Sequence, residues 1–223
     1  MPTPKFTSSW NHLQISIQLI RDNLEPIIIL SLLPSLLAQL GSALVTRHNG
    51  TGYLLVLAGG VWTLVNMPAV VALQLRVAQK KATTTSEAYA VGFRYIWQVL
   101  GVLLLTGVII LLGLICFIVP GLMLLRRYAL APYYVVDKKM DVPQAMRQSW
   151  HDSNHAAGYL WGTIGVTLVV SAVASVLGML FGFIPGATAI VTSILSLAAF
   201  FLLPLRYIEV SRHAKSARAS SGS

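Results

Sequence analysis

The sequence predicts an all-α membrane protein: a polytopic helical bundle of six transmembrane helices with short interfacial amphipathic helices. Of its 223 residues, 56% are hydrophobic and only 10% are charged, whereas about 25% are charged in a typical soluble domain. Several uncharged runs also reach the length of about 20 residues that a bilayer crossing requires. These two observations exclude an ordinary soluble enzyme.

The chain carries a formal charge of +9. In a soluble protein this excess would suggest a nucleic-acid partner. Here the basic residues lie almost entirely between and after the apolar runs, where they orient spans and meet anionic lipid headgroups. We therefore expect anionic membrane lipids, and no nucleic acid, as partners. Cys116 is the only cysteine, which excludes an intrachain disulfide and a cysteine metal cluster.

The first 24 residues predict an amphipathic helix rather than a cleaved secretory signal. Apolar side chains recur there at spacings of three and four, which places them on one helical stripe: Phe6, Trp10, Leu13, Ile17, Ile20 and Leu24. Such a helix lies in the membrane interface. The alternative is a water-facing helix that packs on the bundle.

Six spans follow within one membrane domain, residues 1–211, before a basic and disordered tail, residues 212–223. The expected spans are about 27–46, 53–76, 96–118, 121–137, 157–181 and 187–208. Long uncharged runs must be divided by turns, which we place at two Pro-Gly pairs: Pro120, Gly121, Pro185 and Gly186. The segment 121–137 is the ambiguous one, because it is short for a crossing and could instead be re-entrant.

Two further amphipathic helices are predicted between the spans. Thr84 and Glu87 have the spacing of a capping box, as do Asp141 and Gln144, with a proline in the first turn of the second helix. The organisation is then threefold, with an amphipathic helix followed by two spans each time. Short sequence echoes agree with a repeat, for example 73–76 with 203–206.

Basic residues predict the orientation. With six spans and both termini in the cytoplasm, Arg47 is the only one of sixteen Lys and Arg residues in an outer loop. If 121–137 did not cross, this asymmetry would be lost. We therefore expect a multi-pass membrane protein with both termini in the cytoplasm, and the resemblance described next implies the bacterial cytoplasmic (inner) membrane.

Residues 117–150 resemble a bacterial membrane family. The resemblance rests on the segments FIVPG at 117–121, LLRRY at 124–128, LAPYYVVD at 130–137 and AMRQSW at 145–150. The family comprises the membrane domain attached to some glycerophosphoryl diester phosphodiesterases and related stand-alone integral membrane proteins of unknown function. The resemblance implies a helical membrane domain but no phosphodiesterase activity, because that chemistry belongs to a separate barrel of roughly 250 residues.

Arg126 and Arg127 are the candidate site. They fall in the outer half of the fourth predicted span, where an arginine costs about 2.5–3.5 kcal/mol at the bilayer centre and tends to pair or line a wet cavity. Neighbouring helical residues diverge by about 100°, so the two cannot point the same way. One reading is a pair of arginines near a distorted interface. The other is a site for an anion or a lipid phosphate.

No catalytic set or cofactor motif is present, so we expect no enzyme, no cofactor and no metal. His151 and His155 have the spacing of paired zinc ligands, but no third ligand is evident. The sequence favours a non-catalytic scaffold or partner-binding subunit, with a protein partner or a homo-oligomer. The alternative is a transporter or lipid-handling protein that binds an anionic substrate through Arg126 and Arg127.

Overall fold

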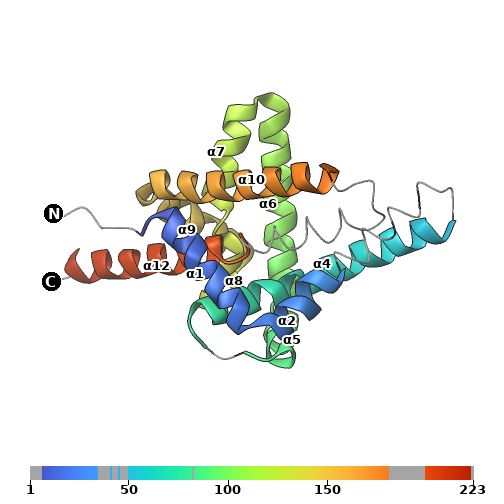
Figure 1. Cartoon of the computed structure of the whole chain (residues 1–223). Coiled ribbons are helices and arrows are strands. Elements are labelled where there is room, and N and C mark those ends of the chain that lie inside the picture. The colour runs from blue at the N-terminus through green and yellow to red at the C-terminus, as the bar shows by residue number, and fades with distance from the viewer. Residues whose placement is uncertain are drawn as a thin grey trace.

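A computed structural model describes residues 7–34, 41, 45, 50–81, 83–180 and 199–221 (Figure 1). Every element in these ranges is helical, which confirms the all-α prediction. The helices are α1 (Ser9–Asp22), α2 (Leu24–Ile27), the π-helix η1 (Ile28–Leu32), α4 (Gly50–Ala78), α5 (Thr85–Arg94), α6 (Ile96–Cys116), α7 (Ile118–Tyr128), α8 (Ala131–Lys138), α9 (Val142–His155), α10 (Ala157–Leu180) and α12 (Leu202–Ser221).

Three of the described helices are long and apolar enough to cross a membrane, namely Thr51–Ala78, Ile96–Cys116 and Ala157–Leu180. The predicted spans 27–46 and 187–208 lie largely outside the described residues. In Figure 1, α6 stands upright, α10 runs across the view and α4 extends to the right. The three therefore meet near one end instead of packing side by side along their lengths, as a bundle would.

The point at which they meet is a compact core, which we call the hub. It combines the end of α4, the start of α6, all of α8, part of α9, the start of α10 and part of α12. Tyr134 and Tyr207 are fully buried there, with ring centroids 4.8 Å apart in an edge-to-face arrangement. Residues 131–136 of α8 are all buried, because this short helix is apolar or aromatic on every side.

The parts of α4, α6 and α10 away from the hub, which we call the arms, expose apolar side chains. They comprise residues 51–65, 103–116 and 165–180 and include Leu54, Ile115 and Met179, whose exposed fractions are 67%, 72% and 79%. These segments contain no charged residue. Soluble monomers rarely expose contiguous apolar patches of this size. The arms are therefore compatible with the hydrocarbon interior of a bilayer.

The predicted fourth span, 121–137, is not one helix. α7 ends at Tyr128 and α8 begins at Ala131, with Pro132 at the first or second position of α8. Pro132 has no N–H to donate to the carbonyl four residues earlier, that of Tyr128, and its ring clashes with that carbonyl in a continuous helix, which explains why α7 ends there. At 1.5 Å per residue, eleven and eight residues give helices of about 16 and 12 Å, each too short for a crossing of about 30 Å.

The chain reverses between α6 and α7 at Phe117, whose backbone is extended (φ −163°, ψ 145°). Pro120 and Gly121, predicted as the turn, lie three and four residues later, in the first turn of α7. A Cβ atom on Gly121 would lie only 2.5 Å from Cγ of Leu114, so this glycine permits the close approach of the two helices. Pro185 and Gly186 lie outside the described residues.

The three amphipathic helices α1, α5 and α9 join the following helix in the same way. Their N-caps are Ser8, Thr84 and Asp141, and the Thr84 hydroxyl accepts a hydrogen bond from Glu87 N at 3.4 Å, as the capping box predicts. A single non-helical residue then precedes the next helix. The three junctions are Asn23 (φ −133°, ψ 43°), Tyr95 (φ −113°, ψ 18°) and Ala156 (φ −110°, ψ 22°). The same local geometry thus recurs three times, as a repeat requires.

The segment 212–221, expected to be a disordered tail, is the helical end of α12. It is rich in Ala, Arg and Lys, which have high helix propensity. It also extends an existing helix, so it does not bear the cost of nucleation.

Candidate functional site

Arg126 lies in the last turn of α7 and is 92% buried, with an exposed fraction of 8%. Its guanidinium carbon lies 5.9 Å from the ring centroid of Trp161 on α10. Its Nε atom is buried and has no hydrogen-bond partner. Among the described residues, no carboxylate forms an ion pair with Arg126. The structure thus buries a cation without giving it a counter-charge from these residues.

Arg127 points to a different neighbour, as helical geometry predicts for adjacent residues. Its guanidinium carbon lies 3.6 Å from the ring centroid of Trp150 on α9. Its carbonyl oxygen accepts hydrogen bonds from the hydroxyls of Ser149 at 2.6 Å and Ser153 at 3.1 Å. This carbonyl is one of those that a helix C-terminus leaves unpaired. The two serines therefore fix the end of α7 and with it the position of both arginines.

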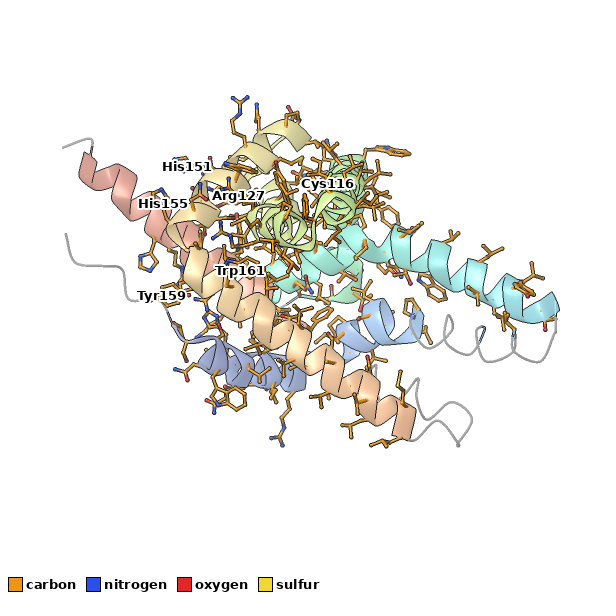
Figure 2. The ribbon with its side chains drawn as sticks, turned by 90° about the horizontal axis from the view of Figure 1, so that it is seen from above. Cys116, Arg127, His151, His155, Tyr159 and Trp161 are labelled. Carbon is orange, nitrogen blue, oxygen red and sulfur yellow. The ribbon has the colours of Figure 1, made fainter. Side chains whose placement is uncertain are left out.

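The arginines lie at the end of α7, beside the hub. α7 returns from the tip of the α6–α7 hairpin and ends against α9 and the start of α10. Figure 2 looks down on this hairpin and shows Arg127 on its side facing α9, which carries His151 and His155. The sequence predicts one continuous helix over 121–137, whereas α7 ends just after the two arginines, at Tyr128. The amphipathic rings of Trp150 and Trp161 are typical of a membrane–water interface.

A second buried arginine, Arg206 on α12, is fully paired within the chain. It has no exposed surface and donates to Glu209 Oε2 at 2.6 Å, to the Thr163 hydroxyl at 3.0 Å and to the Ser9 hydroxyl at 3.3 Å. It also donates to the carbonyl of Thr7 at 3.1 Å. Sequence reasoning missed this cluster. The available signal was Glu209, the one acidic residue after Asp152, three positions from a basic residue.

His12 of α1 completes that cluster, with Nε2 3.7 Å from Glu209 Oε2. Burial, followed by the charge of Arg206, lowers the pKa of His12, and the charge of Glu209 opposes this only in part. The imidazole is therefore neutral at neutral pH. Its Nδ1 atom is buried without a hydrogen-bond partner.

Asp152 on α9 is a buried carboxylate held by the hub. Burial alone would raise its pKa, but hydrogen bonds from Tyr134, Gln148 and His151, together with the charge of Lys138, outweigh that effect. The pKa of Asp152 therefore lies below its ordinary value. The carboxylate fixes α9 against α8 and forms no ion pair with Arg126 or Arg127.

The histidine pair on α9 has the predicted common face. His151 and His155 are exposed, with ring centroids 5.3 Å apart. Within the described residues, no group of three or more His, Cys, Asp or Glu side chains could hold a metal ion. The pair thus has no third protein ligand in this part of the chain.

One shallow cavity of about 350 Å³ lies between α5 and α8. Its walls are apolar, and its polar groups are basic or phenolic: it is lined by Ala90, Val91, Arg94, Tyr95, Val136 and Lys139. No acidic residue lines it. The cavity thus presents two basic side chains, Arg94 and Lys139, and its lining contains no catalytic group.

Comparison with known proteins gives no match: no protein-family model, no curated protein and no solved structure matches the chain. The resemblance of residues 117–150 to the phosphodiesterase-associated membrane domain therefore stays a prediction.

Proposed function

We propose that this chain is a non-catalytic, multi-pass protein of a bacterial cytoplasmic membrane that handles an anionic lipid by holding its phosphate at Arg126 and Arg127. The observation that carries the proposal is the burial of Arg126 without an acidic partner among the described residues. In this proposal the apolar arms lie in the hydrocarbon interior of the membrane. The two arginines lie at the end of α7, beside Trp150 of α9 and Trp161 of α10, and we place the lipid headgroups at their level.

The argument is one of charge balance. A buried charge is costly unless it is paired, and removing one partner of a buried ion pair costs about 3–5 kcal/mol. For Arg206 the chain supplies Glu209 at 2.6 Å. The neighbouring charge that acts on Arg126 is that of a second cation, Arg127. An anion bound from outside would balance both, and phosphate oxygens match the planar donor fork of a guanidinium.

The test is native mass spectrometry of the whole protein extracted with its surrounding lipid. We expect a retained anionic phospholipid that is lost in Arg126→Leu and in Arg127→Leu. Arg147→Leu removes an exposed arginine from α9 and is the matched control, which should keep the lipid. Adding inorganic phosphate shows whether the bound anion is a lipid headgroup or free phosphate. A site for free phosphate would exchange its ligand without loss of lipid. Unchanged lipid retention in folded Arg126→Leu would refute the proposal.

A scaffold or partner-binding subunit is the second candidate. It is favoured by the exposure of the arms: only 11% of the most apolar window of α6 is buried within the chain. A protein partner or a second copy could cover part of this surface. Mild extraction followed by cross-linking tests this function. A defined oligomer or stoichiometric partner without a retained lipid would support it, and recovery of neither would exclude it.

We propose a topology of six membrane segments with both termini in the cytoplasm, in which α7 and α8, each too short to cross alone, together form the fourth segment. Cys116 offers a direct test, since it is the only cysteine and lies exposed at the tip of the α6–α7 hairpin. A thiol reagent that cannot cross membranes should label it from the outer side of intact cells. Labelling only after the inner face is opened would reverse the orientation.

A further inference from the structure

α1 packs on the rest of the protein through a side that mixes polar and apolar residues. His12, Leu13 and Ser16 are buried there, with exposed fractions of 5%, 9% and 0%, and Ile20 is partly buried against neighbouring core residues. Two large apolar side chains point away, Trp10 at 64% and Ile17 at 52% exposed. In a surface helix of a soluble protein the apolar stripe faces the core. The predicted stripe is thus divided, with Leu13 and Ile20 inward and Trp10, Ile17 and the following Leu24 outward.

Polar contacts hold α1 in this orientation. Thr7 N donates to Glu209 Oε1 at 2.6 Å, and the carbonyl of Thr7 accepts from Arg206 at 3.1 Å. Farther along, the Ser16 hydroxyl accepts from the backbone N–H of Phe201 at 3.3 Å in a buried position. α1 therefore does not need its outward apolar side chains for attachment to α10 and α12.

The outward surface of α1 continues into other exposed apolar residues. Leu24 follows the junction at Asn23 and is 49% exposed, and Ile28 and Ile29 of η1 are 45% and 36% exposed. η1 begins the predicted span 27–46. An apolar strip thus leads from α1 toward a predicted membrane helix, with the exposed charges of Arg21, Asp22 and Glu25 beside it. A tryptophan on the apolar edge of a helix whose other exposed residues are polar is typical of a membrane–water interface.

We propose that the outward face of α1, formed by Trp10, Ile17 and Leu24, lies in the headgroup region of the membrane leaflet next to the hub. The occupant of this face is the lipid surface itself. α1 would then join the hub to the membrane, because its inner side binds Arg206 and Glu209 while its outer side rests among lipids. This surface is separate from the site at Arg126.

Tryptophan fluorescence with depth-dependent lipid quenchers tests this placement. The full chain would be reconstituted in phosphatidylglycerol-containing vesicles, with bromine atoms either near the headgroup or deep in the acyl chains. A variant retaining only Trp10 should be quenched most by the shallow bromines. A variant retaining only Trp62, which lies midway along α4, should be quenched most by the deep ones.

The results at Trp10 and at Trp62 test two different claims, which are the interfacial placement of α1 and the position of the arms in the bilayer. Quenching of Trp10 by aqueous iodide and not by brominated lipid would overturn the interfacial placement, as would protection that depends on protein concentration and so indicates a second copy. Loss of deep quenching at Trp62 would instead contradict the proposed bilayer position of the arms. The variant that retains only Trp10 has its other four tryptophans replaced and could fail to fold. In that case a spin label at Ile17→Cys, in the Cys116→Ser chain, tests the placement of α1 instead. Its collision with oxygen should exceed that with a water-soluble nickel chelate, while a label at Gln18→Cys should favour the chelate.

Discussion

Replacing Ala129 by Glu should fill the proposed anion site from within the chain. The template is the pair Arg206 and Glu209, which are three residues apart on one helix with 2.6 Å between NH1 and Oε2. Ala129 is three residues after Arg126 and keeps right-handed helical geometry (φ −56°, ψ −27°). A glutamate there can reach Arg126 in the same way. It would supply the counter-charge that we assign to a bound phosphate.

The expected change in anion affinity follows from the Arg206–Glu209 pair. A hydrogen bond to a charged group contributes about 1.5–3 kcal/mol to stability. Each 1.4 kcal/mol corresponds to a factor of ten in affinity. A bound anion must displace the new carboxylate or share Arg126 with it, so Ala129→Glu should weaken anion binding roughly tenfold to a hundredfold. Without added lipid the same variant should be more stable than the parent protein.

Lipid titration of detergent-purified protein, followed by thermal unfolding, measures both quantities. Ala129→Gln is the control, since it has nearly the same size and no charge. The parent protein and Ala129→Gln should gain thermal stability on addition of phosphatidylglycerol, while Ala129→Glu should gain little. Equal responses from the glutamate and glutamine variants would refute the charge-balance reasoning.

Three further predictions concern stability. Gly121→Val should destabilise the fold by about 1–3 kcal/mol through overpacking in the α6–α7 hairpin, whereas Gly107→Ala, with nothing within 4 Å of its new Cβ, should be neutral or stabilising by up to about 1 kcal/mol in thermal unfolding. Arg206→Leu should cost about 3–5 kcal/mol, because it leaves a carboxylate without its cation, and limited proteolysis should then cut the N-terminal helix first. The pKa of Asp152 is lowered by folding, so its contribution is present above the unfolded value of about 3.9 and is lost as the pH falls through the folded one. Tyr134→Phe removes a hydrogen bond to that carboxylate, and the acid-induced fall in melting temperature should begin at a higher pH.

The helical class and the arms could be predicted from the sequence because they depend on composition. The uncharged runs 51–75, 95–125 and 156–205 are visible without a structure, and they contain the three apolar helices. Capping is also local: the side-chain oxygens of Ser8 and Thr84 accept from backbone N–H groups three positions later, whereas Asp141 caps its helix without such a hydrogen bond. The number of spans and the membrane orientation stay predictions.

The site could be predicted only in part, because burial depends on the packing of distant segments. The sequence singles out Arg126 and Arg127, but the apolar run 121–137 predicts one continuous helix, because an apolar pattern does not show where Pro132 interrupts it. Arg206 was treated as one basic residue among many. Its role became visible only when the structure brought Thr7 and Thr163, 199 and 43 positions away, to the same guanidinium.

The hub core also has a consequence for biosynthesis. Tyr207 of α12 packs against Tyr133 and Tyr134 of α8, with ring centroids 5.6 and 4.8 Å apart. A ribosome adding about 5–20 residues per second therefore delivers α4, α6 and α10 several seconds before the residue that closes the core. During that interval the arms would enter the membrane while the tyrosines of α8 wait uncovered. A nascent chain interrupted before α12 should be recognised by quality-control proteases through that open aromatic surface.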